Sequence, residues 1–304
     1  MKANETLVIG LSEEMWSIYY HSLWRGIMND LQAVTAPVPE IKKKGFFCRI
    51  LHHNPFYIIA SVLILYGLNT AFGTSTDEAE ARVLMSVMAF YALIMALSTV
   101  LIVRLGSVWE DARSMLMICL LMVMAISVSV DELSILKPDT GRSMLLSGMA
   151  IALLLSEGIL RWLRIRLAPM FKYPLYSFIC LFYIYPVIMT WLLEFGKKTI
   201  AAWGIYSFSV VGALLMLSLV PAVRKGTKYV AENGTPWKWP WFPWMAFGFI
   251  GFGLCVRSYY LSLSFYSGPG MESIFSLYFL APLVLAAAVI LLETGIIQRM
   301  FHYK

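Results

Sequence analysis

Residues 82–102 form the stretch RVLMSVMAFYALIMALSTVLI, in which no charged side chain follows Arg82. A helix needs about 20 apolar residues to cross the hydrocarbon core of a bilayer, so this stretch is long enough for one transmembrane helix. Its apolar residues run continuously and do not alternate with polar ones, which favours a helix over a barrel strand. The sequence predicts eight such spans, at 56–74, 82–102, 114–130, 143–160, 173–194, 199–219, 241–261 and 272–292.

The composition agrees with an all-α polytopic integral membrane protein. The 304 residues are 60% hydrophobic and 14% charged, whereas soluble domains carry about 25% charged residues. The net charge of +6 comes from basic residues in short loops, and no basic face with interleaved aromatics suggests nucleic-acid binding. The four cysteines form no CxxC pair, so neither a thiolate zinc site nor a disulfide framework is expected.

Lysine and arginine positions predict the orientation. With the N-terminus in the cytoplasm, 18 of the 24 basic residues fall on the cytoplasmic side and five on the opposite side, with Arg257 left inside a span. This asymmetry follows the positive-inside rule and places the C-terminus in the cytoplasm as well. Free thiols and the lack of a signal peptide fit the plasma (inner) membrane.

Residues 1–55 are predicted to be a cytoplasmic N-terminal segment with one amphipathic helix. Its apolar positions recur at three- and four-residue steps, at Trp16, Tyr20, Leu23, Trp24, Ile27 and Leu31. Such a helix suits the membrane interface, but it can equally pack on the cytoplasmic loops of its own chain. It is also a surface that a membrane-protein partner could use.

Short motifs recur in the same order in the two parts of the chain and predict a 4+4 tandem repeat. Asn54-Pro55-Phe56-Tyr57 resembles Tyr173-Pro174-Leu175-Tyr176, and Ile126-Ser127-Val128-Ser129 resembles Leu261-Ser262-Leu263-Ser264. The exits of the second and sixth spans and the glutamates of the fourth and eighth also correspond. The repeats would be residues 56–172 and 173–304. Because four spans return the chain to the same side, the repeats would be related by an axis along the membrane normal.

Arg257 is the clearest candidate for a functional residue, because a charge inside a span is costly. It would bind a carboxylate or phosphate of a substrate, or a lipid headgroup. The alternative is that it extends to the outer interface as many long basic side chains do. The repeat places Met122 at the corresponding position, so the charge would belong to the second repeat alone.

Glu157 and Glu293 occupy related positions near the cytoplasmic ends of the fourth and eighth spans. Arg161 follows Glu157 at the i,i+4 spacing that favours an ion pair. Either the two glutamates are paired helix ends, or they flank a cytoplasmic opening that binds cations or protons.

The rest of the sequence offers little chemistry. No histidine, lysine or aspartate lies within a predicted span, and GxSxG and HExxH motifs are absent. We therefore expect no enzyme activity, no cofactor and no metal site. The expected function is a non-enzymatic membrane component, such as a scaffold, a sensor or a complex subunit. The alternative is a small-molecule or lipid transporter with a cleft between the two repeats and with Arg257, Glu157 and Glu293 as ligands.

Overall fold

The computed structural model describes Leu63, Tyr66 and residues 78–194, 198–239, 241–266 and 276–302. These residues are helical or lie in turns, and none of them belongs to a β-strand. The chain divides into two compact units, residues 1–49 and 50–304, and every described residue belongs to the second. Seven helices in this part are long and apolar enough to cross a membrane. The described part of the chain is thus all-helical, with seven helices of membrane-spanning length.

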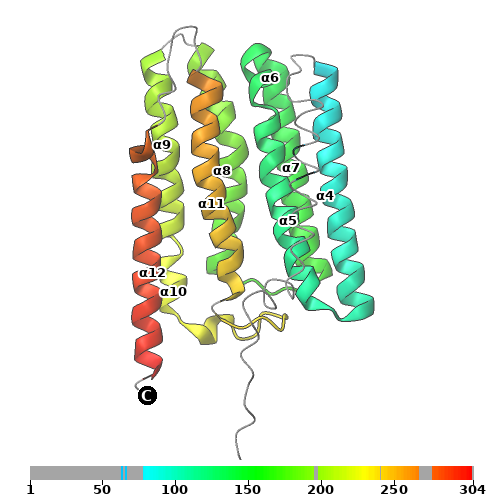
Figure 1. The fold of residues 1–304 in the computed structure, drawn as a ribbon, viewed down its shortest axis with the longest axis vertical. Coiled ribbons are helices and arrows are strands. Elements are labelled where there is room, and N and C mark those ends of the chain that lie inside the picture. The colour runs from blue at the N-terminus through cyan, green and yellow to red at the C-terminus, as the bar shows by residue number, and fades with distance from the viewer. Residues whose placement is uncertain are drawn as a thin grey trace, which may run out of the picture. The chain divides into compact units, whose positions relative to one another are not determined.

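The long helices lie side by side in a bundle (Figure 1). In chain order they are α4 (Glu78–Gly106), α5 (Trp109–Ser129), α6 (Asp131–Leu136), α7 (Pro138–Trp162), α8 (Pro169–Glu194), α9 (Lys198–Leu217), α10 (Val220–Arg224), the 3₁₀ turn η1 (Thr227–Val230), α11 (Trp241–Tyr266), the 3₁₀ turn η2 (Leu277–Leu280) and α12 (Ala281–His302).

Seven of the predicted spans coincide with these long helices. The one at 82–102 lies inside α4, for example, and the one at 143–160 lies inside α7. The span predicted at 56–74 lies outside the described residues except for the helical positions Leu63 and Tyr66. The amphipathic helix within 1–55 lies outside them altogether, so both stay predictions.

Local sequence explains why α4 forms and where it ends. Its 29 residues extend about 44 Å at 1.5 Å per residue, more than the roughly 30 Å of bilayer hydrocarbon. Glu78 and Glu80 occupy its first turn and Arg104 its last, where these charges oppose the helix dipole. Arg104 also donates from Nε and Nη2 to the carbonyl oxygen of Trp162, at 2.9 and 2.7 Å, and thereby ties α4 to the end of α7.

The helices pack as two groups. In the α4–α7 group, α4 lies against α5 and α7; in the α8–α12 group, α9 lies against α8, α11 and α12. The groups contact each other where α7 meets α8 and where α5 and α6 meet α8 and α11. Any polar contact along these seams therefore joins the two groups.

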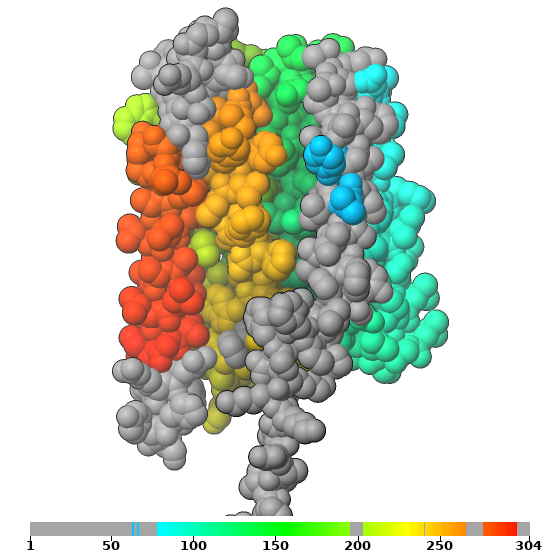
Figure 2. Space-filling view, viewed as in Figure 1, coloured from blue at the N-terminus to red at the C-terminus, as the bar shows by residue number. Residues whose placement is uncertain are grey.

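The outward faces of the bundle carry large apolar side chains. On α12 these include Val284, Leu285, Leu291 and Leu292, each 61–72% exposed. Figure 2 shows the side chains of α12, in red, as an outer column beside those of α11. An apolar surface of this extent is typical of contact with lipid.

Candidate functional site

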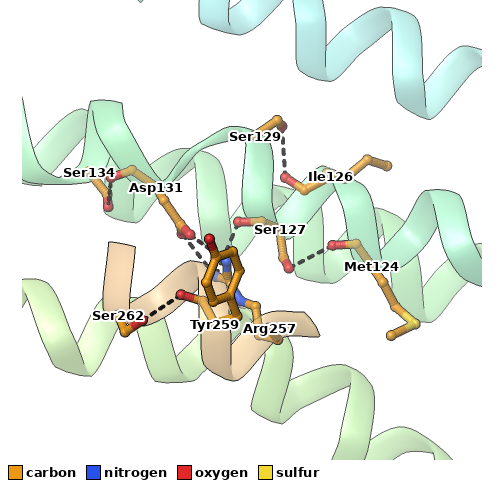
Figure 3. A network of polar contacts seen from close by, with 9 residues as sticks. All are labelled: Met124, Ile126, Ser127, Ser129, Asp131, Ser134, Arg257, Tyr259 and Ser262. Carbon is orange, nitrogen blue, oxygen red and sulfur yellow. Dashed lines mark hydrogen bonds and ion pairs between the residues drawn. The ribbon is translucent and has the colours of Figure 1, made fainter. Parts of the chain in front are cut away.

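A buried ion pair joins α11 to the junction of α5 and α6. Arg257 is 0% exposed and Asp131 is 1% exposed. Arg257 donates from Nη2 to Asp131 Oδ1 at 2.8 Å and from Nη1 to Asp131 Oδ2 (Figure 3). Two parallel bonds of this kind match the planar guanidinium to the carboxylate and make the contact directional.

The end of α5 contributes a further acceptor for the guanidinium. Arg257 Nη2 also lies 3.3 Å from the carbonyl oxygen of Ser127, in the last turn of α5. The carbonyl groups at a helix C-terminus carry partial negative charge, so a cation is favoured there. The hydroxyls of Ser127 and Ser129 donate to carbonyls three residues earlier, at 2.8 and 2.9 Å (Figure 3). The positive charge is therefore balanced by one carboxylate and one helix end.

Two details show how closely the pair is enclosed. Arg257 Nε has no hydrogen-bond partner among the residues that the structure describes. The neighbouring Ser258 shares a buried hydrogen bond of 2.9 Å with Ser209 of α9, which ties the same turn of α11 to α9. Because a buried charge without a partner is strongly destabilising, Arg257 and Asp131 depend on each other.

Asp131 lies one residue beyond the third predicted span, yet it is buried in the continuation of the same helical segment. The third span was predicted to end at residue 130, whereas the membrane-length helix continues from Trp109 to Leu136, with α6 following α5 directly. Asp131 is the first residue of this continuation. An acidic residue can be buried here because Arg257, 126 residues away in the chain, pairs with it.

The sequence allowed two interpretations of Arg257: a side chain that binds an anionic ligand, or one that extends to the outer interface. Its side chain is buried between helices, so it does not extend to an interface. It also does not line the apolar pocket at the start of α5 or the smaller apolar space that adjoins it. The sequence missed its partner, although an acidic residue just beyond one span and a basic residue inside another were visible signals.

Glu157 links α7 to α8. Arg161 lies where the i,i+4 spacing predicted, with its Nε 2.7 Å from Glu157 Oε1. Lys172 Nζ lies 3.1 Å from Glu157 Oε2, and the hydroxyl of Tyr176 donates to the same oxygen. Since Lys172 and Tyr176 belong to α8, this carboxylate holds the two groups together at one end of the α7–α8 seam.

A second set of polar contacts holds the other end of that seam. Arg142 of α7 forms an ion pair with Glu194 of α8. Its Nε also donates to the hydroxyl of Thr190 at 3.3 Å. Along the seam of α5 with α8, Tyr183 donates to the carbonyl oxygen of Val123 at 2.5 Å.

Glu293 is held by a different residue. Arg224 of α10 donates from Nη2 to Glu293 Oε1 at 2.5 Å and from Nε to Glu293 Oε2 at 3.2 Å. This contact joins α10 to α12, within the α8–α12 group. Arg257, Glu157 and Glu293 thus have separate partners, and the structure does not bring the three sequence candidates into one site.

A partly open apolar pocket lies between the two groups, near the end of the bundle where α5 begins. It has a volume of about 140 Å³ and is lined by α5, α7, α8 and the first turns of α11. Arg113 and Ser156 are polar residues in its wall, and the guanidinium of Arg113 lies 5.9 Å from the ring centre of Trp241.

Within the described ranges, no three His, Cys, Asp or Glu side chains gather where they could hold a metal ion.

Comparison of the chain with protein-family models, with curated proteins and with solved structures finds no match. The functional argument therefore rests on the contacts described above.

Proposed function

We propose that this protein is a non-enzymatic component of the plasma (inner) membrane, acting as a scaffold, a sensor or a subunit of a membrane complex. In this proposal it crosses the bilayer eight times and keeps both termini in the cytoplasm. The long apolar helices and their exposed apolar faces support a membrane location, and the basic residues support the orientation.

The observation that carries the proposal is the pairing of Arg257 with Asp131. A transport site would present such charges to a cavity, where an ion or substrate could replace one partner. Here the two charged groups satisfy each other in the packed interior. Glu157 and Glu293 likewise take part in ion pairs. This arrangement suits a bundle that holds one shape and presents its surface to a partner.

The packing supports the proposed tandem repeat, with residues 56–172 and 173–304 as its two parts. The repeat equates α5 with α11 and α4 with α9. α5 and α11 contact each other, while α4 and α9 each lie against their own group's later helices. Equivalent helices that meet at the centre are expected when two repeats are related by an axis along the membrane normal.

A partner is the first thing to test, and we expect one to bind through the predicted N-terminal helix and the cytoplasmic loops. Native mass spectrometry of the tagged chain, extracted from its own host in nanodiscs, should show a second protein in fixed ratio. Replacing Trp16 and Trp24 by Asp should remove that mass, because the apolar face of the helix would be lost. Recovery of the unmodified chain as a lone monomer would contradict the proposal.

The proposed topology has its own test. In a background without native cysteines, Asp139→Cys and Glu232→Cys place thiols at exposed positions near opposite ends of the bundle. A membrane-impermeant maleimide added to intact cells should label Asp139→Cys and leave Glu232→Cys unlabelled until the membrane is permeabilised. The reverse pattern would invert the orientation, and equal labelling of both in intact cells would place the two ends on one side.

The second candidate is a transporter or lipid-handling permease, and one observation favours it. The apolar pocket lies between the α4–α7 and α8–α12 groups, where a cleft between repeats was expected. The pocket is apolar and does not include Arg257, however, so a polar substrate held by that arginine has no support. Uptake or lipid flipping by the purified chain in vesicles, lost on filling the pocket, would favour this candidate over the scaffold.

A further inference from the structure

The pocket between the two helix groups runs lengthwise along α5. Arg113 and Val123 both line it, and they lie ten residues apart on α5. Ten helical residues rise about 15 Å, which is half of the roughly 30 Å of bilayer hydrocarbon. The pocket therefore extends along α5 over about the thickness of one leaflet.

The walls are suited to a hydrocarbon chain along this length. Leu120, Val123, Leu155 and Phe247 line the pocket from α5, α7 and α11. A smaller apolar space above it is also lined by Leu120 and Val123, together with Phe178 and Tyr183 of α8. An apolar pocket stays dry and takes an apolar occupant, because water would find no hydrogen-bond partners there.

The entrance has a different character. Arg113 is the one charged side chain in the described wall of the pocket, and it lies close to Trp241. Trp237 lines the same entrance, with its ring 5.4 Å from that of Trp109. Tryptophan prefers the headgroup level of a bilayer, so this end of the pocket lies where a lipid phosphate would lie.

The charge distribution selects the kind of lipid. The proposed orientation places this entrance on the cytoplasmic side, where anionic lipids attract basic residues. Arg164, Arg166 and Lys238 are exposed in the adjoining loops, and Ile165 between the two arginines lines the pocket. These basic side chains outnumber the two acidic ones in the first turn of α5, Glu110 and Asp111, so the entrance complements an anionic headgroup better than a neutral one.

We propose that this pocket binds one acyl chain of an anionic phospholipid of the cytoplasmic leaflet, with the lipid phosphate at Arg113. This lipid site goes beyond the proposed function, since it is expected in a scaffold as well as in a permease. A scaffold would use the lipid to fill the seam between its two groups.

The test measures lipid retention in nanodiscs of phosphatidylcholine with a minor fraction of phosphatidylglycerol. Native mass spectrometry of the full chain should show one retained phosphatidylglycerol. Arg113→Gln should weaken its retention about fivefold, as expected for losing one basic contact near the surface. Arg224→Gln is the matched control, because Arg224 is a basic residue outside the pocket, and it should retain the lipid like the parent.

A second measurement locates the chain of the lipid in the unmodified protein. A phosphatidylglycerol with a photoreactive acyl chain should label peptides that contain Leu120 or Phe247, and Ala246→Trp should abolish this labelling by filling the pocket. Equal retention of both lipids by the parent, or an Arg113→Gln variant that retains phosphatidylglycerol like the control, would overturn the proposal. Labelling confined to the outer faces of α4 and α12 would overturn it as well.

Discussion

Replacing Arg257 by Met is expected to destabilise the helix bundle by about 3–5 kcal/mol, the cost of leaving one member of a buried pair without its partner. Asp131 would remain 1% exposed, facing an apolar side chain where the guanidinium now donates two hydrogen bonds. Asp131→Leu should cost a similar amount, since it leaves the guanidinium buried and unpaired. Equilibrium unfolding in mixed micelles, followed by circular dichroism, measures both losses.

Arg224→Met is the control for this prediction. Arg224 also pairs with a glutamate through two hydrogen bonds, but its side chain is 66% exposed, and exposed pairs contribute little to stability. Its unfolding midpoint should stay close to that of the parent. If Arg257→Met and Arg224→Met shift the midpoint equally, the burial of Arg257 has no energetic consequence and the account of the pair is wrong.

Gly141→Ala is the second variant with a large expected effect. A Cβ atom at Gly141 would lie 2.2 Å from the Cα and 2.8 Å from the backbone nitrogen of Ser134. These are backbone atoms of α6, which cannot move aside as the end of a flexible side chain can. The start of α7 would have to separate from α6, and overpacking of this kind costs about 1–3 kcal/mol or more. The loss of stability should appear as a lower unfolding midpoint in mixed micelles, followed by circular dichroism.

The same helix supplies the control for that variant. Gly158 is also in α7, and a Cβ atom there would have no neighbour within 4 Å. Gly158→Ala should therefore leave stability unchanged or raise it by up to about 1 kcal/mol, the helix-propensity difference between the two residues. Equal destabilisation by both alanines would show that the close approach of α6 and α7 is absent.

The parts of the fold that could be predicted from sequence are those that depend on nearby residues. Uninterrupted apolar stretches such as 82–102 determine a membrane-length helix by themselves, and the structure has a helix at that place. The Glu157–Arg161 pair was predictable for the same reason, since both partners lie on one helix one turn apart.

The candidate site could not be predicted in this way, because it depends on which helices become neighbours. The hydrophobic pattern ends the third span at residue 130, and nothing local shows that Asp131 continues it against Arg257 of α11. The contacts of Glu157 with Lys172 and Tyr176 likewise need α7 and α8 to lie side by side. The apolar pocket is lined by four helices, and the sequence of any one of these helices does not predict a pocket.

The central claim is that the buried pair of Arg257 and Asp131 holds the two helix groups together at the contact of α11 with α5 and α6. A double-mutant cycle tests this claim most directly. The unfolding free energies of the parent, Arg257→Met, Asp131→Leu and the double variant are measured under one set of conditions. We predict that the double variant is about as stable as the parent, because replacing both members of a buried pair by apolar residues is often neutral. Losses in the two single variants that simply add in the double variant would contradict the claim, since residues out of contact behave additively.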